Sequence, residues 1–288
     1  MNKSNNKRKS HFRLFVQRFS RNKLAVFGLI FIVIIILAAL LAPYIAPYGY
    51  DDQDVSRRLT KPNSEHWFGT DDLGRDVFSR MIYGARVSLS IGISTTTISM
   101  FTALIIGMIS GYYGGKVDNI IMRIVDIFLA IPSILLSIAI AATLGGGIVS
   151  MLIAISLGAV PGVSRLIRAQ VMAESHKEYI EAAKVTRASD LRIMFKYIFP
   201  NILSVFIVTF TMGVAGGILN ASMLSFIGLG AQAPIPEWGA MLSGGRQYIR
   251  DYPYLVTYPG IMISITVFSI NMFGDGLRDA FDPKLKGR

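Results

Sequence analysis

The stretch IFLAIPSILLSIAIAATLGGGIVSMLIAISLGAVPGVS, residues 127–164, contains no charged side chain. An α-helix rises about 1.5 Å per residue, so about 20 residues cross a hydrocarbon core roughly 30 Å thick. The stretch is therefore too long for one crossing. Gly145, Gly146 and Gly147 lie near its middle, where the backbone freedom of glycine favours a tight turn. We predict a hairpin of two membrane-spanning helices.

Three other charge-free runs have the length of a membrane-spanning helix: residues 24–50, 87–115 and 252–274. Such runs are informative because a charged side chain at the bilayer centre costs about 2.5–3.5 kcal/mol. A further run, residues 197–236, is ambiguous by length. It ends with Pro234 and Pro236, which lack backbone donors, so we expect one helix followed by non-helical chain. With the hairpin, the runs predict an all-α membrane protein of six transmembrane helices.

The overall composition agrees with a membrane protein. Hydrophobic residues make up 52% of the chain, charged residues make up 16%, and the mean hydropathy is +0.49, all far from a soluble domain. The absence of cysteine excludes disulfides, thiolate catalysis and Cys-ligated metal. His11, His66 and His176 lie in separate hydrophilic segments, so we expect no metal site.

The distribution of positive charge predicts the orientation. Residues 1–23 are rich in Lys and Arg and contain no acid, which places the N-terminus in the cytoplasm under the positive-inside rule. Six spans return the C-terminus to the same side, with the basic segment 165–196 and the tail residues Arg278, Lys284, Lys286 and Arg288. This topology accounts for the net charge of +11, for which nucleic-acid binding is the alternative explanation. The block Leu24–Ala42 exceeds the apolar region of a secretory signal, so an uncleaved anchor is expected.

Several catalytic and energy-coupling motifs are absent. The chain has no G-x-x-x-x-G-K-[ST] phosphate loop, and its nearest approach, Gly111–Val117, has the wrong spacing. It also lacks a Ser/His/Asp arrangement and a zinc-protease helix motif. The charge-free runs leave no ionisable group near the bilayer midplane for proton or sodium coupling. We therefore expect a non-enzymatic chain whose energy comes from a partner.

The segment YIEAAKVTRASDLRIMFKYIFPN, residues 179–201, joins the fourth and fifth predicted spans. Its two adjacent alanines favour a helix, Ser189 and Asp190 are good caps for a second helix, and Pro200 suits the first turn of the next span. We predict two short helices joined by a turn. A solvated amphipathic loop on anionic lipid is the alternative, since the segment is basic.

This segment resembles the EAA loop of ABC-importer permeases in its Glu-Ala-Ala start and in the spacing to Ile and Pro. It departs from that pattern at Arg187, where glycine is usual, and at Phe199, where leucine is usual. The resemblance implies a helix that docks on an ATPase subunit and transmits its closure. The coupling residues it implies are Glu181, Ala182, Ala183, Arg187, Ala188, Ser189, Asp190, Ile198 and Pro200.

Further segments are similar to the C-type subunit of dipeptide, oligopeptide and nickel permeases. They are WFGTDDLGRDVFSR at 67–80, YGAR at 83–86, GYYGG at 111–115, PEWG at 236–239 and GDGLRD at 274–279. Without the resemblance, Gly69–Asp76 is a turn-rich loop held by carboxylate and guanidinium contacts, and we favour that structural role over substrate contact.

Two features near the predicted spans are candidates for structure or transport. Arg123 and Asp126 are spaced to pair on one helix face, and we expect a structural ion pair rather than a gate. A second group of small and polar residues suits either a wet pathway or close helix packing. This group comprises Ser94, Thr95, Thr96, Thr97 and Ser99, with Gly213, Gly216, Gly217 and Asn220.

The resemblance implies the type I ABC-importer permease fold in a prokaryotic inner membrane. The implied division is a cytoplasmic segment 1–23, a first span with its external loop 24–86, a permease domain 87–276 with coupling loop 171–200, and a cytoplasmic tail 277–288. The implied partners are a second related permease, two ATPase subunits that bind ATP and magnesium, and an extracytoplasmic binding protein. No cofactor is expected in this chain, and no nucleic acid.

Two alternatives to peptide import remain open at this point. The same machinery imports nickel or another chelated metal in some relatives, and no residue of this chain decides between the two cargoes. A self-sufficient channel or secondary carrier is the alternative from another class.

Overall fold

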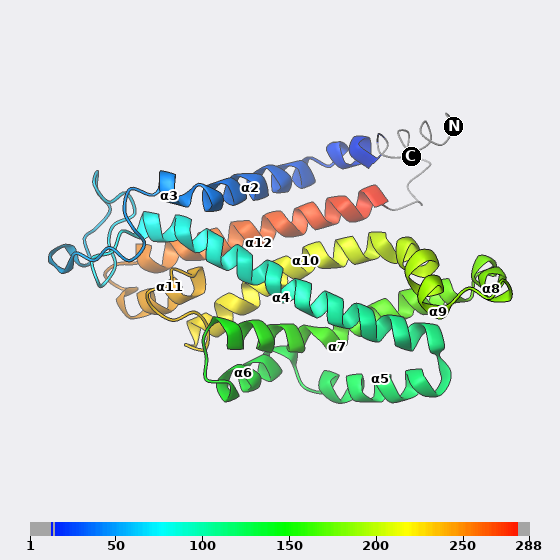
Figure 1. Ribbon diagram of the computed structural model, residues 1–288. Coiled ribbons are helices and arrows are strands. Elements are labelled where there is room, and N and C mark those ends of the chain that lie inside the picture. The colour runs from blue at the N-terminus through cyan, green and yellow to red at the C-terminus, as the bar shows by residue number, and fades with distance from the viewer. Residues whose placement is uncertain (1–12, 14, 282–288) are drawn as a thin grey trace.

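The computed structural model describes residue 13 and residues 15–281. Four charged or titratable residues named above, His11, Lys284, Lys286 and Arg288, lie outside the described residues. Within the described part the chain is helical, with one isolated β-bridge between Thr70 and Asp76. The long helices run side by side in one elongated bundle (Figure 1). The expected all-α architecture is confirmed.

The bundle has two ends, which we name by the short helices found there. The α11 end carries α3 (Ala42–Ile45), η1 (Val55–Arg57), α11 (Trp238–Gly245) and η3 (Arg246–Tyr248), and the α8 end carries α8 (Glu178–Val185) and α9 (Asp190–Arg192) (Figure 1). Helix α2 begins and helix α12 ends at the α8 end. The first and last membrane-spanning helices therefore have their outer ends at the same end of the bundle.

Five helices in the described part are long and apolar enough to cross a membrane. They are α2 (Lys23–Leu40), α4 (Val77–Tyr113), α7 (Ile148–Ser175), Asp190–Phe226 and α12 (Tyr254–Phe281). The fourth comprises α9, the π-helical η2 (Ile193–Ile198) and α10 (Phe199–Phe226). A bent pair, α5 (Gly115–Leu129) and α6 (Ser133–Thr143), completes a sixth candidate span.

The bent pair corrects one expectation, since residues 127–144 do not form a straight crossing. Helices α5 and α6 meet at an angle of 83°. Pro132 lies at the break, where a proline withdraws its backbone donor and forces the preceding residue out of the helical region. The predicted turn is confirmed, because α6 ends at Thr143, α7 begins at Ile148, and Gly145, Gly146 and Gly147 between them have positive φ.

The second span also differs from its prediction, because α4 begins at Val77 instead of residue 87. Asp76 caps it, accepting a hydrogen bond from Ser79 N at 2.7 Å. Arg80 then lies inside the helix, where its guanidinium donates to Tyr50 O at 2.7 Å and lies 3.5 Å from Asp71. A cation with such partners is tolerated near a span end, and a search for charge-free runs misses it.

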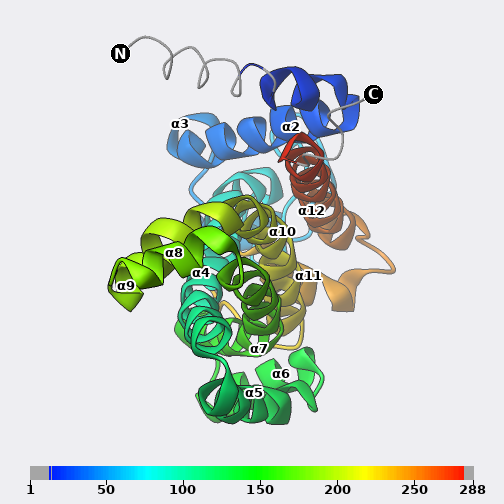
Figure 2. The same cartoon turned by 90° about the vertical axis from the view of Figure 1, so that its right-hand side faces the viewer.

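Helix α4 packs in the middle of the bundle between α7 and α10 (Figure 2). Glycines bring these helices close together. A Cβ on Gly217 would lie 2.6 Å from Thr95 Oγ1, and one on Gly213 would lie 2.7 Å from Thr96 Cγ2. The G-x-x-x-G pair of α10 therefore packs directly on α4, which is the close helix packing expected as one of its two roles.

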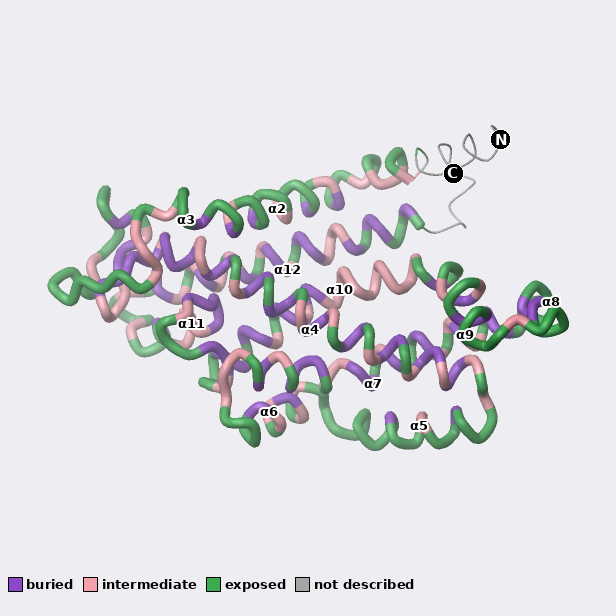
Figure 3. The backbone as a smooth tube through the Cα atoms, in the orientation of Figure 1, coloured by how far each residue is buried: buried purple, intermediate pink, exposed green. Residues whose placement is uncertain are grey.

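The outermost helix, α2, contacts the bundle mainly through α12 (Figure 2). Gly28 makes this contact close, because a Cβ there would lie 2.4 Å from Ser269 O. The rest of its apolar surface is exposed and drawn green in Figure 3, including Leu24, Phe27 and Ile30. Large apolar side chains around an otherwise uncharged helix are suited to hydrocarbon.

Candidate coupling segment and translocation crevice

The segment 178–200 at the α8 end has one buried and one exposed face. Ile180 and Ala183 of α8 are 0% and 8% exposed, and they pack with Ile193 and Ile198 against α4 and α7. Glu181 and Ala182 face outward. Ala182 and Ala183 were predicted to have the same role. In the structure they lie on different faces of α8, because successive residues on a helix point about 100° apart.

The turn after α8 has the left-handed backbone that its pattern predicts. Arg187 has φ +54°, and it donates from N to Lys184 O at 3.0 Å. Ala188 N donates to Ala183 O at 3.2 Å, which ends the helix in the manner usual for a glycine at this position. Ser189 then caps α9, accepting from Arg192 N at 3.4 Å. Pro200 lies in the first turn of α10, so the predicted pair of short helices is present.

Two tyrosines attach this segment to α4. Tyr112 and Tyr113 donate to the two carboxylate oxygens of Asp190 at 2.8 and 3.0 Å. Lys184 Nζ lies 5.5 Å from the centre of the Tyr112 ring, a cation–π distance. Asp190 was predicted as a helix cap and, through the resemblance, as a coupling residue, but not as a partner of tyrosines. The adjacent tyrosines in GYYGG were the available signal for a contact, but nothing in the sequence gave their partner.

Glu174 attaches the same segment to α7 and α10. This carboxylate is 7% exposed, receives Lys177 Nζ at 2.6 Å and accepts a hydrogen bond from the Tyr179 hydroxyl. The Tyr179 oxygen in turn accepts from Asn201 Nδ2 of α10 at 3.2 Å. Burial and the hydrogen bond to Glu174 raise the pKa of Tyr179 to about 12. The hydroxyl therefore keeps its proton at neutral pH and remains a donor to Glu174.

A crevice runs along α7 and α10. A cavity of about 440 Å³ lies between α4, α7 and α10, and a second of about 460 Å³ lies between α7, α10 and α12. The two share Leu166, Thr209 and Met212. A third cavity, of about 310 Å³ beside α6, shares Ile155, Ala159, Val163 and Asn220 with the first. We call the three together the crevice.

The crevice contains some of the predicted pathway residues and not others. Thr95, Thr96, Ser99, Gly213, Gly216, Gly217 and Asn220 line it. Ser94 and Thr97 do not line these cavities, and the Thr97 hydroxyl donates to Ile93 O at 2.7 Å within its own helix. The α7 contribution was missed because its lining residues, apart from Gln170, are ordinary apolar residues and glycines, which give no sequence signal.

The predicted ion pair between Arg123 and Asp126 is wrong. Asp126 pairs instead with Arg165 of α7, and Asp118 of α5 pairs with Arg168 one turn along α7. Arg168 Nε lies 2.5 Å from Asp118 Oδ1. The sequence spacing identified neighbours on one helix, but the carboxylates on the inner face of α5 meet guanidinium groups of the next helix. These pairs hold α5 against α7.

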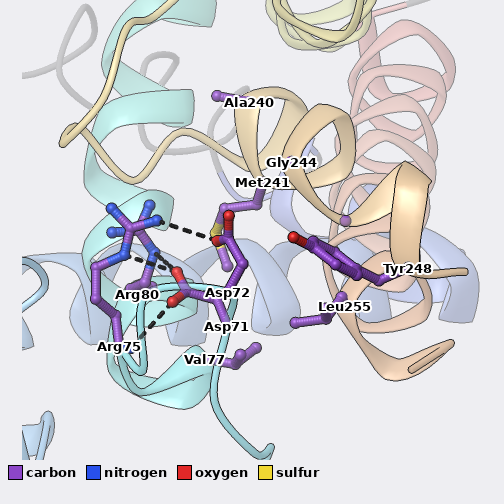
Figure 4. A pocket seen from close by; sticks show the side chains of 11 residues that line it. Asp71, Asp72, Arg75, Val77, Arg80, Ala240, Met241, Gly244, Tyr248 and Leu255 are labelled. Carbon is purple, nitrogen blue, oxygen red and sulfur yellow. Dashed lines mark hydrogen bonds and ion pairs between the residues drawn. The ribbon is translucent and has the colours of Figure 1, made fainter. Parts of the chain in front are cut away.

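The Gly69–Asp76 loop at the α11 end is held by its own charges, as its composition predicted. Asp71 accepts from Arg75 Nε at 2.7 Å, and Arg80 lies beside it (Figure 4). His66 Nδ1 lies 2.9 Å from Asp76, and both side chains are buried. Within the described residues no group of three metal-ligating side chains is found. The loop is a structural anchor for the start of α4.

The apolar helices and the crevice between them have the features of a multi-pass membrane protein. Residues 103–287 match the family described as the binding-protein-dependent transport system inner membrane component, and residues 10–62 match the N-terminal transmembrane domain of oligopeptide transport permease C. The chain belongs to this family of ABC-importer permeases. It is thus an integral inner-membrane permease subunit, and the resemblance drawn from its motifs is confirmed.

Relatives with known names agree over almost the whole chain. A dipeptide transport system permease protein of Alkalihalophilus pseudofirmus is 48% identical, covering 96% of this chain and 91% of the relative. An oligopeptide transport system permease protein of Bacillus subtilis is 40% identical, covering 93% and 88%. A glutathione transport system permease protein of Pectobacterium atrosepticum is 41% identical, covering 96% and 92%.

A solved structure supports the fold. An inward-facing form of the MetNI methionine ABC transporter aligns with a TM-score of 0.58 at 20% identity, covering 70% of this chain and 97% of that one. The type I importer fold expected from the sequence is therefore confirmed.

Proposed function

We propose that this chain forms half of the translocation pathway of an ATP-driven importer of short peptides and is driven through the segment 178–200. The observation that supports this most is how the segment is attached. Asp190 joins it to α4 through Tyr112 and Tyr113, and Glu174 joins it to α7 and, through Tyr179, to α10. These three helices line the first cavity of the crevice, the one of about 440 Å³, which we call the central cavity.

The proposed mechanism follows from those contacts. A force on α8 moves the cytoplasmic ends of α4, α7 and α10 as rigid rods, because the helices are packed through glycines and do not compress. The crevice then opens and closes between them. The exposed face of α8, with Glu181 and Ala182, is the surface on which an ATPase subunit docks. ATP and magnesium belong to that subunit.

The remaining partners and the orientation are part of the same proposal. The α8 end is cytoplasmic, with residues 1–23 and 277–288, and the α11 end receives substrate from an extracytoplasmic binding protein in a prokaryotic cell. Residues 24–86 form the first span and external loop, and 87–276 form the permease domain with its coupling loop 171–200. A second related permease completes the pathway, and two ATPases drive the pair.

Peptide is the proposed cargo because the named relatives carry dipeptides, oligopeptides or glutathione. The central cavity is also suited to a peptide whose side chains vary from one cargo to the next. Its polar groups are hydroxyls and one amide, from Thr95, Thr96, Ser99, Thr209 and Asn220, and the rest of its lining is apolar or glycine. Such a surface hydrogen-bonds peptide groups without selecting one side chain.

The test is reconstitution of the chain with its second permease, two ATPases and binding protein in liposomes. We expect uptake of a labelled dipeptide that requires ATP and the binding protein. Parallel assays with labelled nickel, and with this chain alone, address the two alternatives. Uptake of nickel but not dipeptide, or flux by the isolated chain without ATPase subunits, would overturn the proposal.

A further inference from the structure

The crevice ends at the α8 end in a cavity lined by α7, α10 and α12. Its polar side chains are Gln170, Ser204, Thr209 and Arg278, and its apolar side chains include Leu166 and Phe281. Because it shares Leu166, Thr209 and Met212 with the central cavity, a molecule leaving that cavity along α7 and α10 passes this group.

Among the described residues that line the three cavities of the crevice, Arg278 is the sole ionisable one. Asp275 and Asp279 lie within one turn of it on α12, yet neither lines these cavities. Among the described residues Arg278 makes no ion pair within 4.0 Å, while Asp279 accepts from Asn22 Nδ2 at 3.4 Å. The described lining of the crevice therefore has one positive charge at its end and no negative charge.

We propose that Arg278, with Gln170 and Ser204, forms a carboxylate-binding site at the α8 end of the crevice. A guanidinium binds a carboxylate through two parallel N–H donors, and the amide and hydroxyl that line the same cavity supply further donors. This proposal rests on the peptide function above, and the ligand is the terminal carboxylate of the peptide in transit. The peptide ammonium has no such partner here, so the carboxylate leads the peptide toward the cytoplasm.

The site is tested in the complete reconstituted importer with two cargoes, a dipeptide with a free carboxylate and the same dipeptide with a C-terminal amide. Each is supplied at saturating concentration with the same binding protein. The measured quantity is the uptake rate of the Arg278→Gln variant divided by that of the unmodified importer, for each cargo. The preference of the binding protein cancels in this ratio.

We expect Arg278→Gln to lower uptake of the free dipeptide roughly two- to fivefold, the range of a partly exposed ion pair, with little change for the amide. Arg278→Lys should retain most of the difference between the cargoes. Lys116→Gln removes an exposed cation that does not line the crevice, and it should change neither ratio.

Equal losses for both cargoes, with weakened ATPase co-purification, would assign Arg278 to subunit contact and overturn the site. Unchanged uptake of both cargoes would also overturn it while leaving peptide import intact. Failure of the unmodified importer to take up either dipeptide would instead reject the proposed function itself.

Discussion

The two ends of the bundle use charged and polar residues in opposite ways. At the α11 end the buried charged groups find partners inside the chain. Arg75 pairs with Asp71, Asp76 caps α4, and Glu237 accepts from backbone N–H groups at the start of α11. Asp76, Arg75 and Glu237 are 3%, 7% and 0% exposed. At the α8 end α8 leaves its outer face open, with Val185 82% exposed and Leu191 66% exposed nearby. The charged loop Gly69–Asp76 is thus structural, whereas the exposed small and apolar residues of the segment 178–200 form a surface suited to a partner.

The largest effect is expected from Asp76→Ala at the α11 end. The substitution removes the cap of α4 and leaves the buried His66 without its partner. Loss of a cap costs about 1 kcal/mol and an unsatisfied buried group about 1–3 kcal/mol, so we expect the chain to lose about 2–4 kcal/mol of stability. Thermal unfolding in detergent measures this. Glu181→Ala, on the open face of α8, is the control and should leave the melting temperature unchanged.

Bulky substitutions at the two alanines of α8 should have different effects, one on uptake and the other on stability. Ala182→Trp on the exposed face should leave abundance normal but lower uptake more than about tenfold, because it obstructs docking. Ala183→Trp should instead destabilise the chain by about 1–3 kcal/mol through overpacking against its own helices. Abundance and uptake, measured together for both variants, check this. The same phenotype for both would remove the distinction between the two faces.

A smaller effect is expected where the segment joins α4. Tyr112→Phe combined with Tyr113→Phe removes both hydrogen bonds to Asp190 while keeping the rings. ATPase subunits should still co-purify, but stimulation of ATP hydrolysis by the loaded binding protein should fall about two- to fivefold, the value of one or two modest hydrogen bonds. Undiminished stimulation of ATP hydrolysis would show that α4 does not transmit movement between the segment 178–200 and the crevice.

The smallest effect is expected from Arg187→Gly. A non-glycine residue in the left-handed region costs about 1–2 kcal/mol, and glycine returns roughly 0.5–1 kcal/mol of this through its greater freedom in the unfolded chain. A net gain of about 0–1 kcal/mol with normal transport should follow, measured by thermal unfolding and uptake. A severe transport loss would show that the guanidinium has a contact in the complex.

The sequence predicted most of what depends on lipid solubility and local backbone chemistry. Charge-free runs located the spans, and the three glycines located the hairpin turn. Arg187, at a position where glycine is usual, indeed has a positive φ. These features follow from neighbours along the chain. Pro132 is also a local signal for a bend, but the hairpin prediction used only the length of the run, its lack of charge and its three glycines.

The sequence could not predict pairings between distant elements. Asp126 was assigned to Arg123 because both lie on one helix, whereas its partner comes from α7. The cavity residues of α7 and the contact of Glu174 with Tyr179 likewise depend on how helices are arranged in space. A chain that places few charges in its spans gives little signal for such contacts.

Contact between the open face of α8 and an ATPase subunit is directly testable, because the chain contains no cysteine. Ala182→Cys introduces a single thiol at that face, and Tyr44→Cys, at a residue 87% exposed near the α11 end, is the matched control. A membrane-permeant thiol-to-amine crosslinker is added to the assembled importer. We expect a covalent adduct of this chain with the ATPase for Ala182→Cys and none for Tyr44→Cys. An importer that is active but yields no ATPase adduct from Ala182→Cys would contradict the account.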